Sequence, residues 1–366
     1  MSEPRRVYSL DVFRGITICL MIIVNTPGSW AFVYSQLSHA KWHGCSVADF
    51  IFPFFLFIVG ASMRFAFVKW HHYPSKEFYS HILKRTCSIF FAGIMLNAFP
   101  FIRQDWDWSE FRYLGVLQRI ALSYGLSALL IIKFDFKQLI QILASLLLFY
   151  WAILWIGGGQ YPYSLEDNLV RKIDLIVLGK DHLYGGFGVR FDPEGILSTI
   201  PSIGSIIIGY LMGGMLHTTK NYNDCAKRMF IFGCITSMVG YVWGFALPIN
   251  KPLWTSSYVL FTGGIAATFL SILTYLIDIK NWKKSFWIFE VFGSNAIFLF
   301  ILSGLWIKTI TRIKLELDEN TVSAYHYLYK TVFYPIGGDM NGSLLFAFAH
   351  VLFYWVILFW LYINKI

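Results

Sequence analysis

Two histidines and a carboxylate lie close together in one short stretch of the sequence. His39, His43 and Asp49 stand where a polar segment meets a long apolar run. A neutral imidazole can take a proton from an amine or attack an acyl group itself, and a nearby carboxylate can fix its tautomer. The same residues would also suit an interfacial cluster of His and Trp, with Asp49 capping a helix. The spacing alone leaves both interpretations open.

The first apolar run is interrupted by a polar segment. Asn25, Thr26, Pro27, Gly28 and Ser29 combine an amide, a residue without an N–H group and a helix-weakening glycine. Irregular backbone within a membrane is tolerated only where protein or a water-filled cavity supplies hydrogen-bond partners. The segment therefore predicts either the start of an internal cavity or a proline kink in which Asn25 bonds to a neighbouring helix.

Other polar side chains lie within or beside apolar runs. Arg119 follows Gln118 in the fourth run, and an arginine there is a functional candidate because its charge is costly in a membrane. Arg64 stands near one end of its run, where the side chain can reach the interface, so we interpret it as structural. Asp192 and Glu194 precede another run and could bind a sugar or cap the following helix.

The composition indicates which elements must position these side chains. Of 366 residues, 57% are apolar and 14% are charged, which is more apolar surface than a soluble domain can bury. The net charge of +9 does not indicate nucleic-acid binding, because the basic residues separate the apolar runs instead of gathering on one face. We therefore predict an all-α integral membrane protein, a polytopic bundle of about ten transmembrane helices. The predicted spans are 16–34, 47–68, 82–101, 114–132, 138–157, 195–216, 227–247, 257–277, 286–307 and 343–363.

Basic residues are distributed unequally between the two sides of this bundle. Loops on the side of the N-terminus hold sixteen Lys and Arg residues, and the short loops opposite hold four, which predicts a cytoplasmic N-terminus. The segments 158–194 and 308–342 are too polar to span and are expected to be longer extracytoplasmic loops. Without an internal repeat or a linker, residues 1–366 are predicted to form one transmembrane domain. Five cysteines without motif spacing predict neither a metal site nor a disulfide framework.

Six segments, taken in order, resemble the heparan-α-glucosaminide N-acetyltransferase family, and in particular bacterial relatives of the lysosomal transmembrane enzyme. They are SLDVFRG (9–15), HAKWHGCSVADFIFPF (39–54), GVLQRIA (115–121), FDPEG (191–195), NKPLWTSSY (250–258) and FGSNAI (292–297). Each segment alone is weak evidence, but six in order are specific.

The resemblance implies an enzyme that uses cytoplasmic acetyl-CoA to acetylate a terminal glucosamine on the far side of a membrane. The family's active-site histidine stands in a block of the form His-Ala-x-Trp-x-Gly-x-x-x-x-Asp and matches His39, not His43. Asn25 matches a polar position of the family's first span, and Asp49 is expected to orient the histidine. These three residues are the expected catalytic group.

The remaining site residues are expected to bind the two substrates. Arg14, Gln118, Arg119 and Lys251 are expected on the side of acetyl-CoA, whose phosphates a basic inner surface would attract. Asp192, Glu194 and His43 are expected to bind the acceptor. Because the chain opens almost directly with the family motif, we expect an amino sugar or a cell-wall fragment as acceptor, not heparan.

Several alternatives remain open at this stage. His39 could carry the acetyl group covalently or act as a general base in a ternary complex. A transporter of amino sugars would also contain a broken first helix and polar residues at mid-membrane, and a glycan O-acyltransferase would keep the same donor. The resemblance further implies a multi-pass protein of a bacterial inner membrane and suggests a homodimer.

Overall fold

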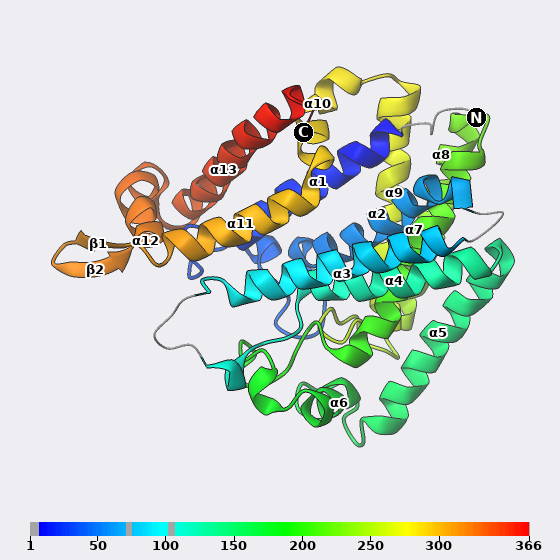
Figure 1. The fold of residues 1–366 in the computed structure, drawn as a ribbon, viewed down its shortest axis with the longest axis horizontal. Helices are drawn as coiled ribbons and strands as arrows, with labels where there is room; N and C mark the ends of the chain where they lie inside the picture. Colours follow the sequence, from blue (N-terminus) through cyan, green and yellow to red (C-terminus); the bar gives the residue numbers. More distant parts are fainter. Residues whose placement is uncertain (1–6, 71–74, 102–106, 366) are drawn as a thin grey trace.

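The computed structural model describes residues 7–70, 75–101 and 107–365, and most of them are helical (Figure 1). Eight helices in this part of the chain are long and apolar enough to cross a membrane, and a bent helix pair would make a ninth span. The prediction of a helical membrane protein is therefore confirmed. Arg5, Arg6 and Arg103, which contribute to the charge count, lie outside the described residues.

The first helix begins and ends earlier than expected. α1 spans Tyr8–Asn25, whereas the sequence pattern favoured 16–34. Its early polar residues are accommodated because Arg14 pairs with Asp11, at 3.1 Å, within the helix. Helical geometry stops at Thr26, just before Pro27, which cannot donate a backbone hydrogen bond. Short 3-10 turns η1 (Ser35–Leu37) and η2 (Val47–Phe50) then lead into α2 (Ile51–Ala66).

The next helices form the centre of the bundle. They are η3 (Val68–Trp70), α3 (Lys76–Ala98), η4 (Trp108–Glu110), α4 (Val116–Lys133), α5 (Phe136–Gly157), α6 (Leu169–Val177), η5 (Lys180–His182) and α7 (Ile196–Thr218). α3 and α4 lie side by side (Figure 1). α3 is long enough to span but is not among the eight candidates, because its first half carries several charges, including Lys84 and Arg85.

α7 is the most buried of the candidate spans and packs closely on α2. Glycines make this approach possible. A Cβ atom added at Gly60 would lie 1.9 Å from the carbonyl oxygen of Ile206, and one at Gly209 would lie 1.9 Å from that of Phe57. These glycines therefore serve packing within the chain, as small residues commonly do between membrane helices.

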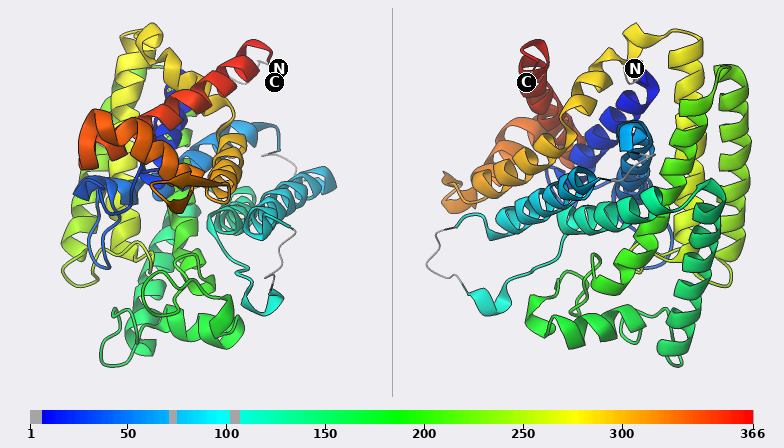
Figure 2. Two further views of the ribbon diagram at one scale, coloured as in Figure 1. Left: turned by 90° about the vertical axis from the view of Figure 1, so that its left-hand side faces the viewer. Right: turned by 45° about the vertical axis from the view of Figure 1, so that its right-hand side comes forward.

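The C-terminal part of the chain adds two long helices, a bent pair and a hairpin. Its elements are α8 (Tyr222–Trp243), α9 (Ser256–Leu273), η6 (Thr274–Ile279), α10 (Lys283–Ser294), α11 (Ala296–Ile310), β1 (Lys314–Leu317), β2 (Asn320–Ser323), α12 (Ala324–Leu328), η7 (Tyr329–Phe333) and α13 (Tyr334–Ile363). α8 and α9 run side by side (Figure 2), and α10 meets α11 at a bend of 68°.

A short β-hairpin stands among the helices of this otherwise all-α fold. β1 and β2 pair antiparallel, with Lys314 opposite Ser323 and Leu317 opposite Asn320. They lie in the segment expected to be a long loop, 308–342, where α13 also begins nine residues earlier than the predicted last span. Alternation of Leu315, Glu316 and Leu317 suits a short strand better than a helix. The segment is thus folded over most of its length.

Four loops that the sequence places on one side of the membrane meet in the structure. The indole N–H of Trp42 donates to the carbonyl of Tyr163 at 2.8 Å, and the side chain of Asn250 donates to the carbonyl of Trp42 at 2.9 Å. Arg112, in the loop before α4, forms an ion pair with Asp192, in the loop before α7. The loops after α1, α3, α5 and α8 therefore build one polar face.

Candidate active site

His39 and Asp49 form a close pair on this polar face. The Nδ1 atom of His39 lies 2.8 Å from Oδ1 of Asp49, while the histidine side chain is 49% exposed and the aspartate 1%. The imidazole is therefore open to an incoming molecule on one side and tied to a buried carboxylate on the other. Asp49, predicted to orient His39, thus lies in hydrogen-bond contact with it.

Local structure fixes the orientation of Asp49. The aspartate lies in η2, where its Oδ2 atom accepts hydrogen bonds from the backbone N–H groups of Ala40 and Ser46, each at 3.0 Å, and from the Ser46 hydroxyl at 3.1 Å. Ser46 and Asp49 together form a capping box. The hydroxyl of Tyr258 on α9 donates to the Asp49 carbonyl at 2.5 Å. The Asp49 side chain thus both caps the start of η2 and contacts His39.

Lys251 completes the cluster from a distant part of the chain. Its Nζ atom lies 3.3 Å from Asp49 Oδ1, 3.1 Å from His39 Nδ1 and 3.5 Å from His39 Nε2. The turn that carries Lys251 is held against the His39 loop, because the N–H of Gly44 donates to the carbonyl of Ile249 at 2.8 Å. The lysine was expected on the acetyl-CoA side, but the structure places it against the catalytic candidates.

The hydrogen-bond pattern assigns the tautomer of His39. Asp49 is surrounded by donors, so it is held as a carboxylate that can only accept. His39 Nδ1 must therefore carry a proton and donate it to Asp49 Oδ1, which leaves the lone pair on Nε2. The ammonium group of Lys251 can only donate, and its nearest acceptor is Asp49. Nε2 is consequently the nitrogen able to accept a proton or attack a carbonyl.

Asn25 and His43 stand apart from this cluster in the described contacts. Asn25 is the last residue of α1 and is exposed. His43 contacts Asn250 instead of His39, with 3.3 Å between its Nδ1 and the Asn250 Nδ2 atom. Partial burial lowers the pKa of His43 below its usual value. The structure thus places His43 in the contact between two loops and Asn25 at the break after α1.

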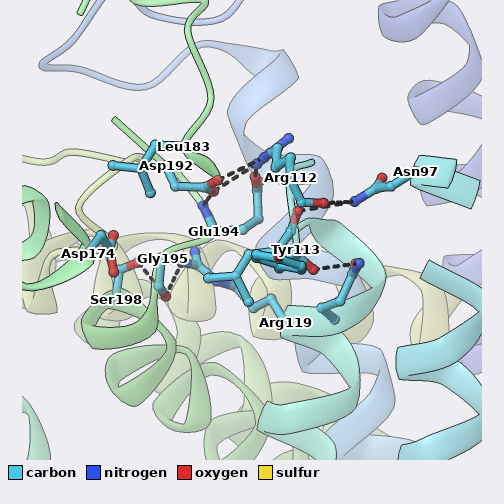
Figure 3. A network of polar contacts seen from close by, with 12 residues as sticks. Asn97, Arg112, Tyr113, Arg119, Asp174, Leu183, Asp192, Glu194, Gly195 and Ser198 are labelled. Atoms are coloured by element: carbon cyan, nitrogen blue, oxygen red, sulfur yellow. Dashed lines mark hydrogen bonds and ion pairs between the residues drawn. The ribbon is translucent and has the colours of Figure 1, made fainter. Parts of the chain in front are cut away.

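A second polar cluster lies at the N-terminal ends of α4 and α7 (Figure 3). Arg112 donates two hydrogen bonds of 2.7 Å to the buried carboxylate of Asp192 and one of 2.6 Å to Glu194. The two carboxylates raise the pKa of Arg112 although burial opposes this effect. Asp192 and Glu194, expected to bind the acceptor, are therefore engaged by an internal cation. Arg112 is one of the four basic residues counted in the short loops opposite the N-terminus, and the sequence predicts no further role for it.

Arg119 on α4 lies next to this cluster and is buried. It donates to the carbonyl of Gly195 at 3.3 Å and to the hydroxyl of Ser198, and its guanidinium stands 5.1 Å from the ring centre of Trp254. The neighbouring Gln118 is also buried and donates to the carbonyl of Tyr113 at 3.0 Å. Both residues lie in the first turn of α4, hold that end of the helix in place and are buried.

Asp174 on α6 lies beside this cluster, next to the first residue of α7. No motif in the sequence predicts a role for it. Its Oδ1 atom accepts the N–H of Ile196 at 2.9 Å, and its Oδ2 atom is buried without a partner among the described residues. Burial raises the pKa of Asp174 to about 7, and the charge of Asp192 adds to this rise while Arg119 opposes it.

Arg14 lies in a different place from the other residues expected to bind acetyl-CoA. It lines a pocket of about 480 Å³ formed by α1, α2, α3, α4 and the bend between α10 and α11. Its guanidinium donates to Ser62 at 2.8 Å and to the carbonyl of Gly293 at 3.2 Å. Arg85 and His81 line the same pocket, and Arg85 stands 5.2 Å from the ring centre of Tyr124.

The pocket is elongated along α2. Its lining on this helix runs from Phe55 to Ala66, which corresponds to about 16 Å of helix at about 1.5 Å per residue. Phe55 follows Asp49 by six residues. The bend at Ser294 and Asn295 contributes the first turn of α11, where backbone N–H groups lack partners within the helix. The pocket thus combines basic side chains, a helix N-terminus and an apolar wall.

Comparisons with known proteins identify the family. A family model described as heparan-alpha-glucosaminide N-acetyltransferase, catalytic, matches residues 6–240. Human heparan-alpha-glucosaminide N-acetyltransferase is 28% identical over 355 residues, covering 81% of this chain and 52% of the human protein. The mouse protein of the same name is 27% identical over 357 residues, covering 82% of this chain and 53% of the mouse protein. The chain spans about half the length of these curated relatives. Because the family model covers well over half of its residues, the chain belongs to the heparan-alpha-glucosaminide N-acetyltransferase family.

Proposed function

We propose that this protein transfers an acetyl group from acetyl-CoA to the amino group of a sugar, with His39 as the reacting side chain. The observation that carries the proposal is the half-exposed imidazole bonded through Nδ1 to a buried carboxylate. Such an arrangement leaves Nε2 available for nucleophilic attack or for proton transfer. Membership of a family of N-acetyltransferases supports acyl transfer as the reaction.

The pocket beside Arg14 is the proposed entry for acetyl-CoA. Its arginines suit the phosphates, and its long apolar wall suits the pantetheine arm, because small-molecule sites combine an apolar lining with a few placed polar groups. The arm would run along α2 from the end near Ala66 toward Phe55. From there the thioester has to pass the first turn of α2 to reach His39.

Two chemical routes fit the pair. In the first, the Nε2 lone pair of His39 attacks the thioester carbon, the C–S bond breaks, and CoA leaves as a thiolate. The sugar amine then attacks the acetyl-imidazole and releases the imidazole, whose Nε2 takes the proton lost by the amine and passes it to the CoA thiolate. In the second, the amine attacks the thioester directly while Nε2 takes its proton and passes it to the departing thiolate. Asp49 stabilises the positively charged imidazole in both routes.

The proposed topology follows from the charge distribution. Ten spans result if α3 crosses the membrane and the bent pair α10 and α11 counts as one, and the N-terminus then lies in the cytoplasm. The face built from His39, Lys251 and the segment 158–194 would be extracytoplasmic. In a bacterial inner membrane, acetyl-CoA would enter from inside and an amino sugar or cell-wall fragment from outside.

A transfer assay tests this function. Purified protein receives acetyl-labelled acetyl-CoA with glucosamine, a glucosamine-terminated oligosaccharide or N-acetylglucosamine, whose amine is blocked. We expect label on the free amines, a loss of at least about 100-fold in His39→Ala, and near-normal activity in His326→Ala, which changes an exposed histidine of α12. Failure of correctly folded wild-type protein to consume the thioester with every acceptor would overturn the proposal.

The same assay separates the alternatives. Label on N-acetylglucosamine alone would indicate transfer to a hydroxyl group. Uptake of sugar into vesicles that is independent of acetyl-CoA and of His39 would indicate a transporter. Substituting Arg85 by Gln tests the proposed entry: KM for acetyl-CoA should rise by about tenfold, which corresponds to the loss of about 1.4 kcal/mol from one phosphate contact.

A further inference from the structure

We propose that the Lys251 ammonium group binds the carbonyl oxygen of the acetyl group while it is transferred, an inference that rests on the proposed function. The family model ends at residue 240, so this lysine lies outside the matched region. Its Nζ atom nevertheless lies within 3.5 Å of three atoms of the catalytic pair, including His39 Nε2. Lys251 is thus the cation closest to the reacting nitrogen among the described contacts.

The ammonium group lies close enough to Nε2 to reach the oxygen of a carbonyl bonded to that nitrogen. Nζ stands 3.5 Å from Nε2, and once Nε2 has attacked the carbonyl carbon, the carbonyl oxygen lies two bonds from Nε2. An ammonium group has three N–H donors. One of them faces Asp49 Oδ1 at 3.3 Å, and the side chain is still 19% exposed, so the others can turn toward a substrate on the open side of His39.

Both proposed routes place a negative charge on the carbonyl oxygen of the acetyl group. When Nε2 or the sugar amine forms a bond to the carbonyl carbon, the carbonyl π electrons move onto oxygen. They return when the leaving group departs, which is the CoA thiolate or, when the amine attacks the acetyl-imidazole, the imidazole. A donor that is already in place stabilises the oxyanion without reorganisation, and removing one such donor typically costs about 100- to 1,000-fold in kcat. Stabilising this oxyanion is useful in both routes, and the short distance from Nζ to Nε2 supports the contact most directly in the first.

Asp49 keeps the lysine suited to this role. Burial lowers the pKa of Lys251, and the neighbouring Asp49 carboxylate partly offsets this by favouring the charged ammonium form. The group is therefore expected to lose its proton at a lower pH than an ordinary lysine. Loss of that proton removes the positive charge beside the oxyanion, so it should produce an alkaline limit in the pH dependence of turnover.

The test compares two substitutions of Lys251 with one of Lys41. Lys251→Met should lower kcat by about 100- to 1,000-fold while KM for acetyl-CoA changes less than about threefold, because the contact forms only in the transition state. Lys251→Arg should recover at least about a tenth of the wild-type kcat and move the alkaline limit to higher pH, since arginine stays charged. Lys41→Met, which removes an exposed lysine two residues from His39, should keep near-normal turnover.

The outcomes distinguish this inference from the proposed function. If wild-type protein transfers acetyl and depends on His39, but folded Lys251→Met keeps more than about a third of wild-type kcat, only the role of Lys251 is refuted. An alkaline limit that stays in place in Lys251→Arg refutes it too, and this readout does not depend on how well Lys251→Met folds. If wild-type protein transfers nothing, the proposed function itself fails.

Discussion

Replacing Asp49 by Asn should reverse the tautomer of His39. The two side chains have the same shape, but Oδ2 of Asp49 accepts three hydrogen bonds from Ala40 and Ser46. The amide oxygen of Asn must occupy this position, because an NH2 group there would face three donors. The NH2 group would then point at His39 Nδ1 and at Lys251. Nδ1 could only accept, so the proton would move to Nε2, the nitrogen required for reaction.

The expected loss follows from the contacts that disappear. A hydrogen bond to a charged acceptor contributes about 1.5–3 kcal/mol. Loss of the carboxylate that stabilises the imidazolium form adds a similar amount, giving about 3–6 kcal/mol in all. At about 1.36 kcal/mol per factor of ten, kcat should fall by roughly 150- to 25,000-fold.

Transfer of labelled acetyl from acetyl-CoA to glucosamine measures this loss, with thermal unfolding in detergent as the check on folding. Asp181→Asn, the same chemical change at an exposed site, should leave kcat near normal. Nitrogen-15 shifts of labelled histidine should place the proton of His39 on Nε2 in Asp49→Asn. Folded Asp49→Asn protein that keeps more than about a third of wild-type kcat, or that keeps the Nδ1–H tautomer, would refute the reasoning.

Three further predictions concern the second polar cluster, around Arg112 and Asp192. Arg112→Met should lower the free energy of unfolding by about 3–5 kcal/mol, because Asp192 would remain buried without its partner. The double mutant with Asp192→Asn should regain part of this free energy, which a double-mutant cycle measures. Asp174 has a folded-state pKa of about 7, above the usual value of about 3.9, so the free energy of unfolding should fall as pH rises from about 4 through 7. In Asp174→Asn the thermal midpoint should depend less on pH over this range. At pH 8 this variant should be more stable than the wild type. Gly195→Ala should lower the thermal midpoint far more than Gly214→Ala, because its new Cβ would lie 1.9 Å from Asp174 Oδ2 while the nearest atom at Gly214 is 3.9 Å away; similar midpoints for the two variants would contradict the packing described.

Local patterns in the sequence predict the membrane helices and single out His39 and Asp49 as candidates, although their spacing alone leaves their role open. Apolar windows about as long as a bilayer is thick identify helices directly. His39 and Asp49 are ten residues apart, and a capping box at the start of a helix brings such neighbours together. The break after Asn25 was also visible, since Pro27 cannot continue a helix.

Contacts between distant segments could not be predicted in the same way. Lys251 stands 212 positions from His39, and Arg112 stands 80 positions from Asp192. No periodicity fixes which side chains from different loops will meet, so Lys251 was expected near acetyl-CoA and Arg112 was given no role. The resemblance to a family identified His39 as the reacting residue but left its neighbours from other loops unassigned.

The glycine contacts between α2 and α7 limit how this protein can move. Backbone atoms of the two helices approach so closely at Gly60 and Gly209 that neither helix can slide or rotate against the other without collision. α2 begins at the turn that holds Asp49 and lines the pocket along most of its length. Any opening and closing of the pocket around a substrate would therefore involve movement at the bend between α10 and α11. Asp49 and the helix that follows it would stay in place.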